Sequence, residues 1–140
     1  EYDAVIEKYL EKNGYIGITQ TSGVLNRENL HRVPRYPMAQ RYATNKGFRL
    51  KLNTLPLPVI STKEDISQNP PILQVKLKKH LNISCFLSSG EAIEVEWLDQ
   101  TTFQTKAKEK LTTRREKYTC TAKADGEKWY WFSYLWILKD

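Results

Sequence analysis

The stretch Leu81-Asn-Ile-Ser-Cys-Phe-Leu-Ser-Ser-Gly-Glu-Ala-Ile-Glu-Val-Glu-Trp97 determines the fold class of this chain. Apolar residues occupy every second position of residues 81–85 and again of residues 93–97, with polar residues between them. A period of two is typical of a strand that has one face on a core and the other in water. Ser88-Ser89-Gly90 supplies turn residues between the two runs. The stretch therefore predicts two short strands of a half-buried sheet.

The same pattern continues on both sides of this stretch. Residues 73–77 alternate in the same way before it, and in residues 118–122 every second side chain shares one face after it. Asp125-Gly126 then gives a strong signal for a hairpin turn. The second half of the chain is therefore predicted to be all-β, with short strands.

The first half is less regular. Residues 2–12 carry apolar side chains at helical spacing and predict an amphipathic helix that ends at Asn13-Gly14. Residues 48–52 alternate and predict a strand, whereas residues 55–60 contain two prolines and predict at most an edge segment. Residues 61–71 are polar, end in two prolines and predict a linker.

We therefore expect the chain to divide near residue 70. Residues 70–140 form the all-β part in this interpretation. Residues 1–69 form a helix plus an irregular or β segment, which is not stable by itself and packs against the β part. The chain has 140 residues and begins at Glu1 without an initiator Met, so we expect it to be a piece of a larger protein.

Composition and spacing exclude several functional classes. The chain has 22 Lys and Arg against 16 Asp and Glu, a formal charge of +6. No apolar run approaches the roughly 20 residues of a membrane-spanning helix, so we expect no membrane span. The two Cys and two His residues are scattered, which predicts no metal site and no cofactor. His80 and Cys85 would lie on opposite strand faces, and no phosphate-binding glycine loop is present, so we expect no enzyme.

The order of Cys85, Trp97, Tyr118 and Cys120 resembles the immunoglobulin fold. The resemblance covers residues 70–140 and implies a short antiparallel β-sandwich whose two sheets are joined by a disulfide between Cys85 and Cys120. It also implies that Trp97 packs on this bridge in the core and that Tyr118 forms a tyrosine corner. The two cysteines are close together for this family, which implies that a strand is missing or is supplied by the first half of the chain.

The same resemblance implies an extracellular or cell-surface recognition module of the adhesion or receptor type, which binds a protein ligand or co-receptor. Asn82-Ile-Ser84 is the only N-glycosylation sequon, and the alternation points Asn82 away from the core. Pairable cysteines and a glycan are both typical of secreted proteins.

Two groups of residues are candidates for partner contact. Residues 129–138 are apolar on both strand faces, so either the first half of the chain covers the outer face or a partner does. The aromatic candidates there are Trp129, Trp131, Tyr134 and Trp136. The basic candidates, which predict a cationic stripe suited to an acidic glycosaminoglycan, are Lys106, Lys108, Lys110, Arg114 and Arg115.

Two other interpretations stay open. The first is an intracellular α+β domain that resembles the nuclear-transport-factor cone, with the N-terminal helix packed on a curved antiparallel sheet. Such a domain would serve in assembly or bind a small ligand, and its two cysteines would be free thiols. The second is a basic nucleic-acid-binding domain, but no glycine-rich or aromatic nucleic-acid motif supports it.

Overall fold

The computed structural model describes residues 4–25, 30–39 and 43–138. Within them the helical elements are α1 (Ala4–Lys12), a short 3-10 helix η1 (Leu30–Arg32) and α2 (Asn45–Leu52). The strands are β1 (Thr54–Pro56), β2 (Val59–Asp65), β3 (Ile72–Leu77), β4 (Ile83–Phe86), β5 (Ala92–Trp97), β6 (Thr102–Lys106), β7 (Arg115–Lys123) and β8 (Trp129–Ile137). None of these helices is long and apolar enough to cross a membrane.

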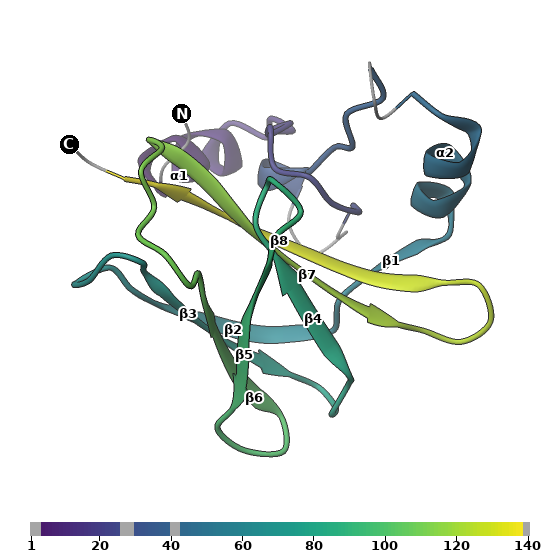
Figure 1. Ribbon diagram of the computed structural model, residues 1–140. Helices are drawn as coiled ribbons and strands as arrows, with labels where there is room; N and C mark the ends of the chain where they lie inside the picture. The colour runs from purple at the N-terminus through teal and green to yellow at the C-terminus, as the bar shows by residue number, and fades with distance from the viewer. Residues whose placement is uncertain (1–3, 26–29, 40–42, 139–140) are drawn as a thin grey trace.

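The strands form one curled sheet in the order β1-β8-β7-β4-β5-β6-β3-β2 (Figure 1). Every neighbouring pair is antiparallel except β1 and β8, which run parallel. The first two residues of β5 pair with β4 and its last four pair with β6, so the sheet turns its corner along this strand. The mainly-β prediction is confirmed, and the half-barrel shape also fits the curved-sheet alternative.

The core lies inside the curl, where the period-two pattern predicted it. Leu73, Val75 and Leu77 of β3 are at most 1% exposed, and they meet the buried side chains of β7 and β4 from the other side of the half-barrel. The most deeply buried residues of β4, β6 and β7 are Cys85, Phe103, Tyr118, Cys120 and Ala122. Alternation in the second half therefore identified the core face of each strand correctly.

One continuous segment connects the two edges of the curled sheet. Residues 54–56 pair with β8 at one edge, and residues 59–65 pair with β3 at the other. Between them, the amide of Leu57 donates to the carbonyl of Trp131 (3.0 Å), and the carbonyl of Pro58 accepts from the amide of Lys78 (2.9 Å). Because this segment belongs to both edges, the first half of the chain completes the β structure. The predicted linker at 61–71 is wrong in its first part, which is strand β2.

Tyr118 fixes the loop between β6 and β7 against the core. Its buried hydroxyl donates to the carbonyl of Pro71 (2.9 Å) and accepts from the amide of Ala107 (3.1 Å). The side chain of Asn69 holds the same loop at Leu111, since it donates to the carbonyl and accepts from the amide of that residue (2.9 and 2.8 Å). The loop is therefore anchored at two points.

Two sequence predictions fail for identifiable reasons. Residues 48–52 lie in α2 and not in a strand, because the side chain of Thr44 accepts from the amide of Gly47 (3.0 Å) and caps a helix there. Phe48, Leu50 and Leu52 stay 43 to 67% exposed, so no core contact favours a strand. The predicted cationic stripe is also wrong as a strand, because β6 ends at Lys106 and Lys108 and Lys110 lie in the following loop.

The anchoring role of Tyr118 gives a stability prediction. Tyr118→Phe removes one hydroxyl and leaves both a buried carbonyl and a buried amide without their partner, so we expect a loss of about 2 to 4 kcal/mol in the free energy of unfolding. Urea unfolding measures it. Tyr130→Phe is the matched control, because Tyr130 is a partly buried tyrosine on the neighbouring strand. Equal losses in the two variants would refute the anchoring role.

Candidate functional site

Strand β8 divides its aromatic residues between two faces. Tyr130, Phe132, Tyr134 and Trp136 pack on the core, and Trp136 is 3% exposed. The hydroxyl of Tyr134 donates to the carboxylate of Glu64 on β2 (2.7 Å), and burial together with this bond raises the pKa of Tyr134. Trp136 is therefore buried in the core, and Tyr134 is half-buried and hydrogen-bonded within the fold, so their role as a partner surface stays a prediction.

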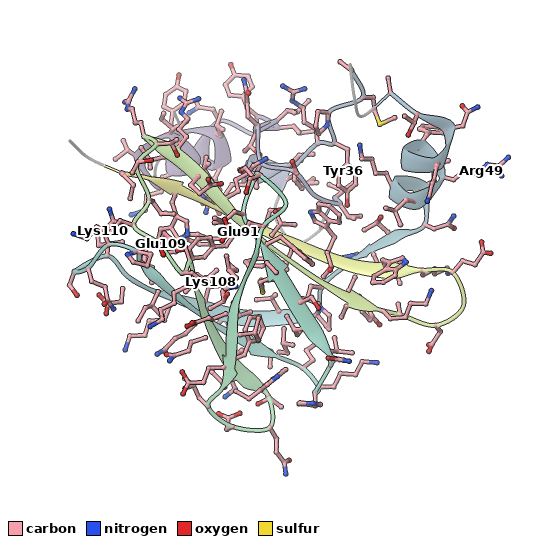
Figure 2. All side chains as sticks on the ribbon, in the orientation of Figure 1. Tyr36, Arg49, Glu91, Lys108, Glu109 and Lys110 are labelled. Atoms are coloured by element: carbon pink, nitrogen blue, oxygen red, sulfur yellow. A yellow bond between two sulfur atoms is a disulfide. The ribbon has the colours of Figure 1, made fainter. Side chains whose placement is uncertain are left out.

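Trp129 and Trp131 lie on the opposite, outer face of β8. Trp131 meets Tyr36 edge to face at 5.4 Å between ring centroids, and its indole nitrogen donates to the hydroxyl of Ser133 (3.0 Å). Figure 2 shows Tyr36 between α2 and β8. The first half of the chain thus covers part of this face, as one of the two sequence interpretations expected.

The uncovered part of this face is a groove of about 650 Å³, which we call the outer groove. Its floor is the outer face of β4, β7 and β8, and its walls are residues 22 and 36–37, helix α2 and the turn between β4 and β5. The lining is mostly apolar, and its principal residues are Tyr36, Leu50, Phe86, Leu87, Trp129, Trp131, Thr119, Thr121, Lys51 and Lys117. A volume of this size and an apolar lining with a few polar groups are typical of ligand sites.

The walls are held in position by contacts from the first half of the chain. The ammonium of Lys51 donates to the carbonyl of Pro37 (3.0 Å), which ties α2 to the segment beside it. The hydroxyl of Thr54 donates to the carbonyl of Leu50 (2.8 Å) where α2 passes into β1. Burial raises the pKa of Tyr36 to about 12, so its phenol stays neutral in the wall.

One end of the outer groove is polar. The ammonium of Lys117 donates to the hydroxyl of the buried Ser22 (3.2 Å). The neighbouring carboxylate of Glu116 accepts from the amides of Ser88 (2.9 Å) and Lys117 (2.7 Å). Burial opposes ionisation of Glu116, but these hydrogen bonds outweigh it and lower the pKa of Glu116 below its ordinary 4.5. Glu116 thereby holds the turn that forms this end.

The disulfide is present, but in a different setting from the one implied by the family resemblance. Cys85 and Cys120 are bonded and face each other on β4 and β7, with 4.1 Å between their Cα atoms. These strands are neighbours in one sheet, so the bridge does not join facing sheets. Trp97 is half-buried and does not pack on the bridge as the resemblance implied: its ring contacts those of His80 (4.3 Å between centroids) and Phe103 (5.4 Å), in the part of β5 that pairs with β6.

The remaining candidate residues do not line the outer groove. Asn82 is exposed just before β4. Lys106 lies 4.0 Å from the carboxylate of Glu94, Arg114 directly precedes β7, and Arg115 is the first residue of β7. Figure 2 shows Lys110 at the end of the molecule away from α2. The structure thus separates the basic candidates from Trp129 and Trp131.

The sequence pattern did not identify the outer groove. Part of its floor could be predicted, because Lys117, Thr119 and Thr121 alternate with the core residues of β7 and must lie on the other face of the strand. Its walls could not, because residues 22 and 36–37 belong to no helix or strand and carry no periodicity. His/Cys/Asp/Glu clusters able to hold a metal are absent from the part of the chain that the structure describes.

Comparison of the chain with protein-family models, with curated proteins and with solved structures found no match. The function is therefore inferred from the geometry and chemistry of the chain itself.

The lowered pKa of Glu116 predicts an acid-sensitive turn. A folded-state pKa below the unfolded value means that the contribution of Glu116 is complete above about pH 4.5 and is lost as the pH falls through the folded value. Glu116→Gln should therefore lose less stability than the wild type between about pH 6 and about pH 3, as measured by urea unfolding.

Glu109→Gln is the control, because Glu109 is an exposed carboxylate in the loop after β6. If Glu116→Gln and Glu109→Gln lose stability on acidification to the same extent, Glu116 does not hold the turn.

Proposed function

We propose that this chain is an extracellular recognition module of the adhesion or receptor type, with an immunoglobulin-like sandwich, and that it binds another protein through the outer groove. The observation that carries the proposal is a groove lined by two tryptophans, Trp129 and Trp131, on a strand that pairs with β7 along nine residues. Trp and Tyr are the side chains most enriched among those that dominate protein–protein binding energy.

The strand order supports the immunoglobulin-like part of the proposal. Constant-type domains of that family have one sheet in the order A-B-E-D and another in the order C-F-G. Here β2-β3-β6-β5 follows the first order, and β4-β7-β8 follows the second. In this alignment Cys85 belongs to strand C and not to strand B, which explains why its bridge to strand F stays within one sheet.

Tyr118 supports the same alignment. It lies on β7, the counterpart of strand F, two residues before Cys120. Its hydroxyl accepts from the amide of Ala107, which directly follows β6, the counterpart of strand E. A tyrosine that ties strand F to the backbone at the E–F corner is a feature of immunoglobulin-like domains.

Two features support an extracellular location. A disulfide between Cys85 and Cys120 is compatible with an oxidising compartment. Asn82 is exposed and precedes β4, so a glycan there would project into solvent. The intracellular cone alternative requires two free thiols at these positions, and the structure describes no free cysteine.

The proposal is tested by binding of the secreted, disulfide-bonded chain to cells. A fluorescent multimer should bind saturably to cells that display the partner, and trypsin treatment of those cells should abolish binding. Trp131→Ala removes a large aromatic side chain from the lining of the groove, so we expect it to weaken binding by about thirtyfold, the equivalent of about 2 kcal/mol.

Leu52→Ala is the matched control, because Leu52 is a large apolar residue that is 67% exposed and lies outside the groove. The proposal fails if no cell type in a broad panel binds the multimer. It also fails if folded Trp131→Ala binds as well as Leu52→Ala does.

A further inference from the structure

The described lining of the outer groove contains basic side chains and no acidic side chain. Its lining includes the ammonium groups of Lys51 and Lys117, and no Asp or Glu side chain is among its described lining residues. The carboxylate of the neighbouring Glu116 accepts from the amide of Ser88 in the β4–β5 turn and from the amide of Lys117 on β7. The electrostatics of the groove therefore favour an anionic ligand.

Lys117 has donor capacity left for such a ligand. A lysine ammonium has three N–H donors, and that of Lys117 makes one hydrogen bond, to Ser22, among the described residues. The two salt bridges within the described residues involve other cations, Arg32 and Lys106. A carboxylate at this end would form a charge-assisted hydrogen bond in a partly desolvated position, where such bonds are strongest.

The groove also has an apolar end at a defined distance from Lys117. Lys117, Thr119 and Thr121 face the groove in succession along β7, and Trp131 lies directly opposite Thr121 on β8. Positions 117 and 121 of β7 are four residues apart, about 13 Å along the strand, which is the length of a short extended peptide segment. Thr119 lies between these two levels of β7 and its hydroxyl is hydrogen-bonded to that of Ser133 (3.0 Å), whereas the hydroxyl of Thr121, beside Trp131, can hydrogen-bond a peptide backbone.

We propose that the outer groove binds an extended peptide segment of its protein partner that carries an aromatic or aliphatic side chain about three or four residues from an Asp or Glu. The apolar side chain packs on Trp131 and Trp129, and the carboxylate accepts from Lys117. This inference rests on the proposed function, because it names the part of the protein partner that the groove recognises.

A peptide in the outer groove would be recognised by side chains and not by backbone pairing as an added strand of the sheet. The floor strands β7 and β8 pair with each other along nine residues, and β7 pairs on its other side with β4. Their backbone groups are therefore engaged, and a ligand must be recognised by side chains. Aromatic anchors with a nearby charge pair give that kind of recognition.

Selection from a library of random linear peptides displayed on phage tests the inference on the full, disulfide-bonded chain. We expect enriched sequences to combine Trp, Phe, Leu or Ile with an Asp or Glu about three or four residues away. In an anisotropy titration with a selected peptide, Lys117→Gln should weaken binding about tenfold. Lys108→Gln, an exposed lysine outside the groove, should not change it.

Replacing the acidic residue of the peptide by its amide probes the same contact without changing the protein. This change should also weaken binding about tenfold, and it should have little further effect on Lys117→Gln, because both changes remove one interaction. Neutral or basic enriched peptides, or equal binding by Lys117→Gln and the wild type, would overturn the inference. So would selection of no peptide while dodecanoate binds the groove, since the ligand would then be a small amphipathic anion.

The two proposals fail in different ways. If binding to cells depends on Trp131 but the selected peptides lack an acidic residue, the proposed recognition function is supported and the acidic peptide segment is refuted. If acidic peptides are selected but the chain binds no cells, the proposed function is refuted and the peptide affinity of the groove is supported.

Discussion

The register between β4 and β7 is the constraint on which the rest of the structure depends. Cys85 lies opposite Cys120, and their disulfide locks this pairing. Side chains of a strand alternate between faces, so a shift by one residue would exchange the two sides. If β7 shifted, Lys117 and Thr119 would point into the core, and Tyr118 would lose its partners at Pro71 and Ala107. One covalent bond therefore fixes both which residues form the core and which form the floor of the outer groove.

The first half of the chain turns this floor into a site. Residues 54–65 pair with both edges of the curled sheet. Because helix α2 directly precedes the part that pairs with β8, α2 and the segment before it lie beside the outer face of β8 (Figure 1). Tyr36 then covers part of Trp131, and Lys51 ties α2 to Pro37. The aromatic excess of β8 is explained by this double contact: its inner face fills the core, and its outer face meets the first half of the chain and the groove.

The sequence predicted those features of the fold that depend on the alternation of apolar and polar residues within one strand. Alternation identified the core positions of β3, β4 and β7 because each strand has one face in a shared core. It failed at residues 48–52, where a hydrogen bond to Thr44 outside the alternating run determines a helix. The family resemblance led us to expect the bridge between Cys85 and Cys120, but it placed the two cysteines on facing sheets and Trp97 on the bridge. It could not tell which strands are neighbours, because strand order depends on contacts distant in sequence. The groove walls depend on Tyr36 and Pro37, which carry no periodicity, so no local pattern could have revealed them.

The central claim is that Cys85 and Cys120 are direct cross-strand neighbours in one sheet. NMR of the isotope-labelled, oxidised chain tests it most directly. Paired residues with Cα atoms 4.1 Å apart form the close, non-hydrogen-bonded type of antiparallel pair, in which the two Hα atoms face each other. The account predicts a strong nuclear Overhauser effect between the Hα atoms of Cys85 and Cys120. Its absence from a fully assigned spectrum, with Cys85 showing cross-strand contacts to a strand other than β7 or β5, would contradict the account.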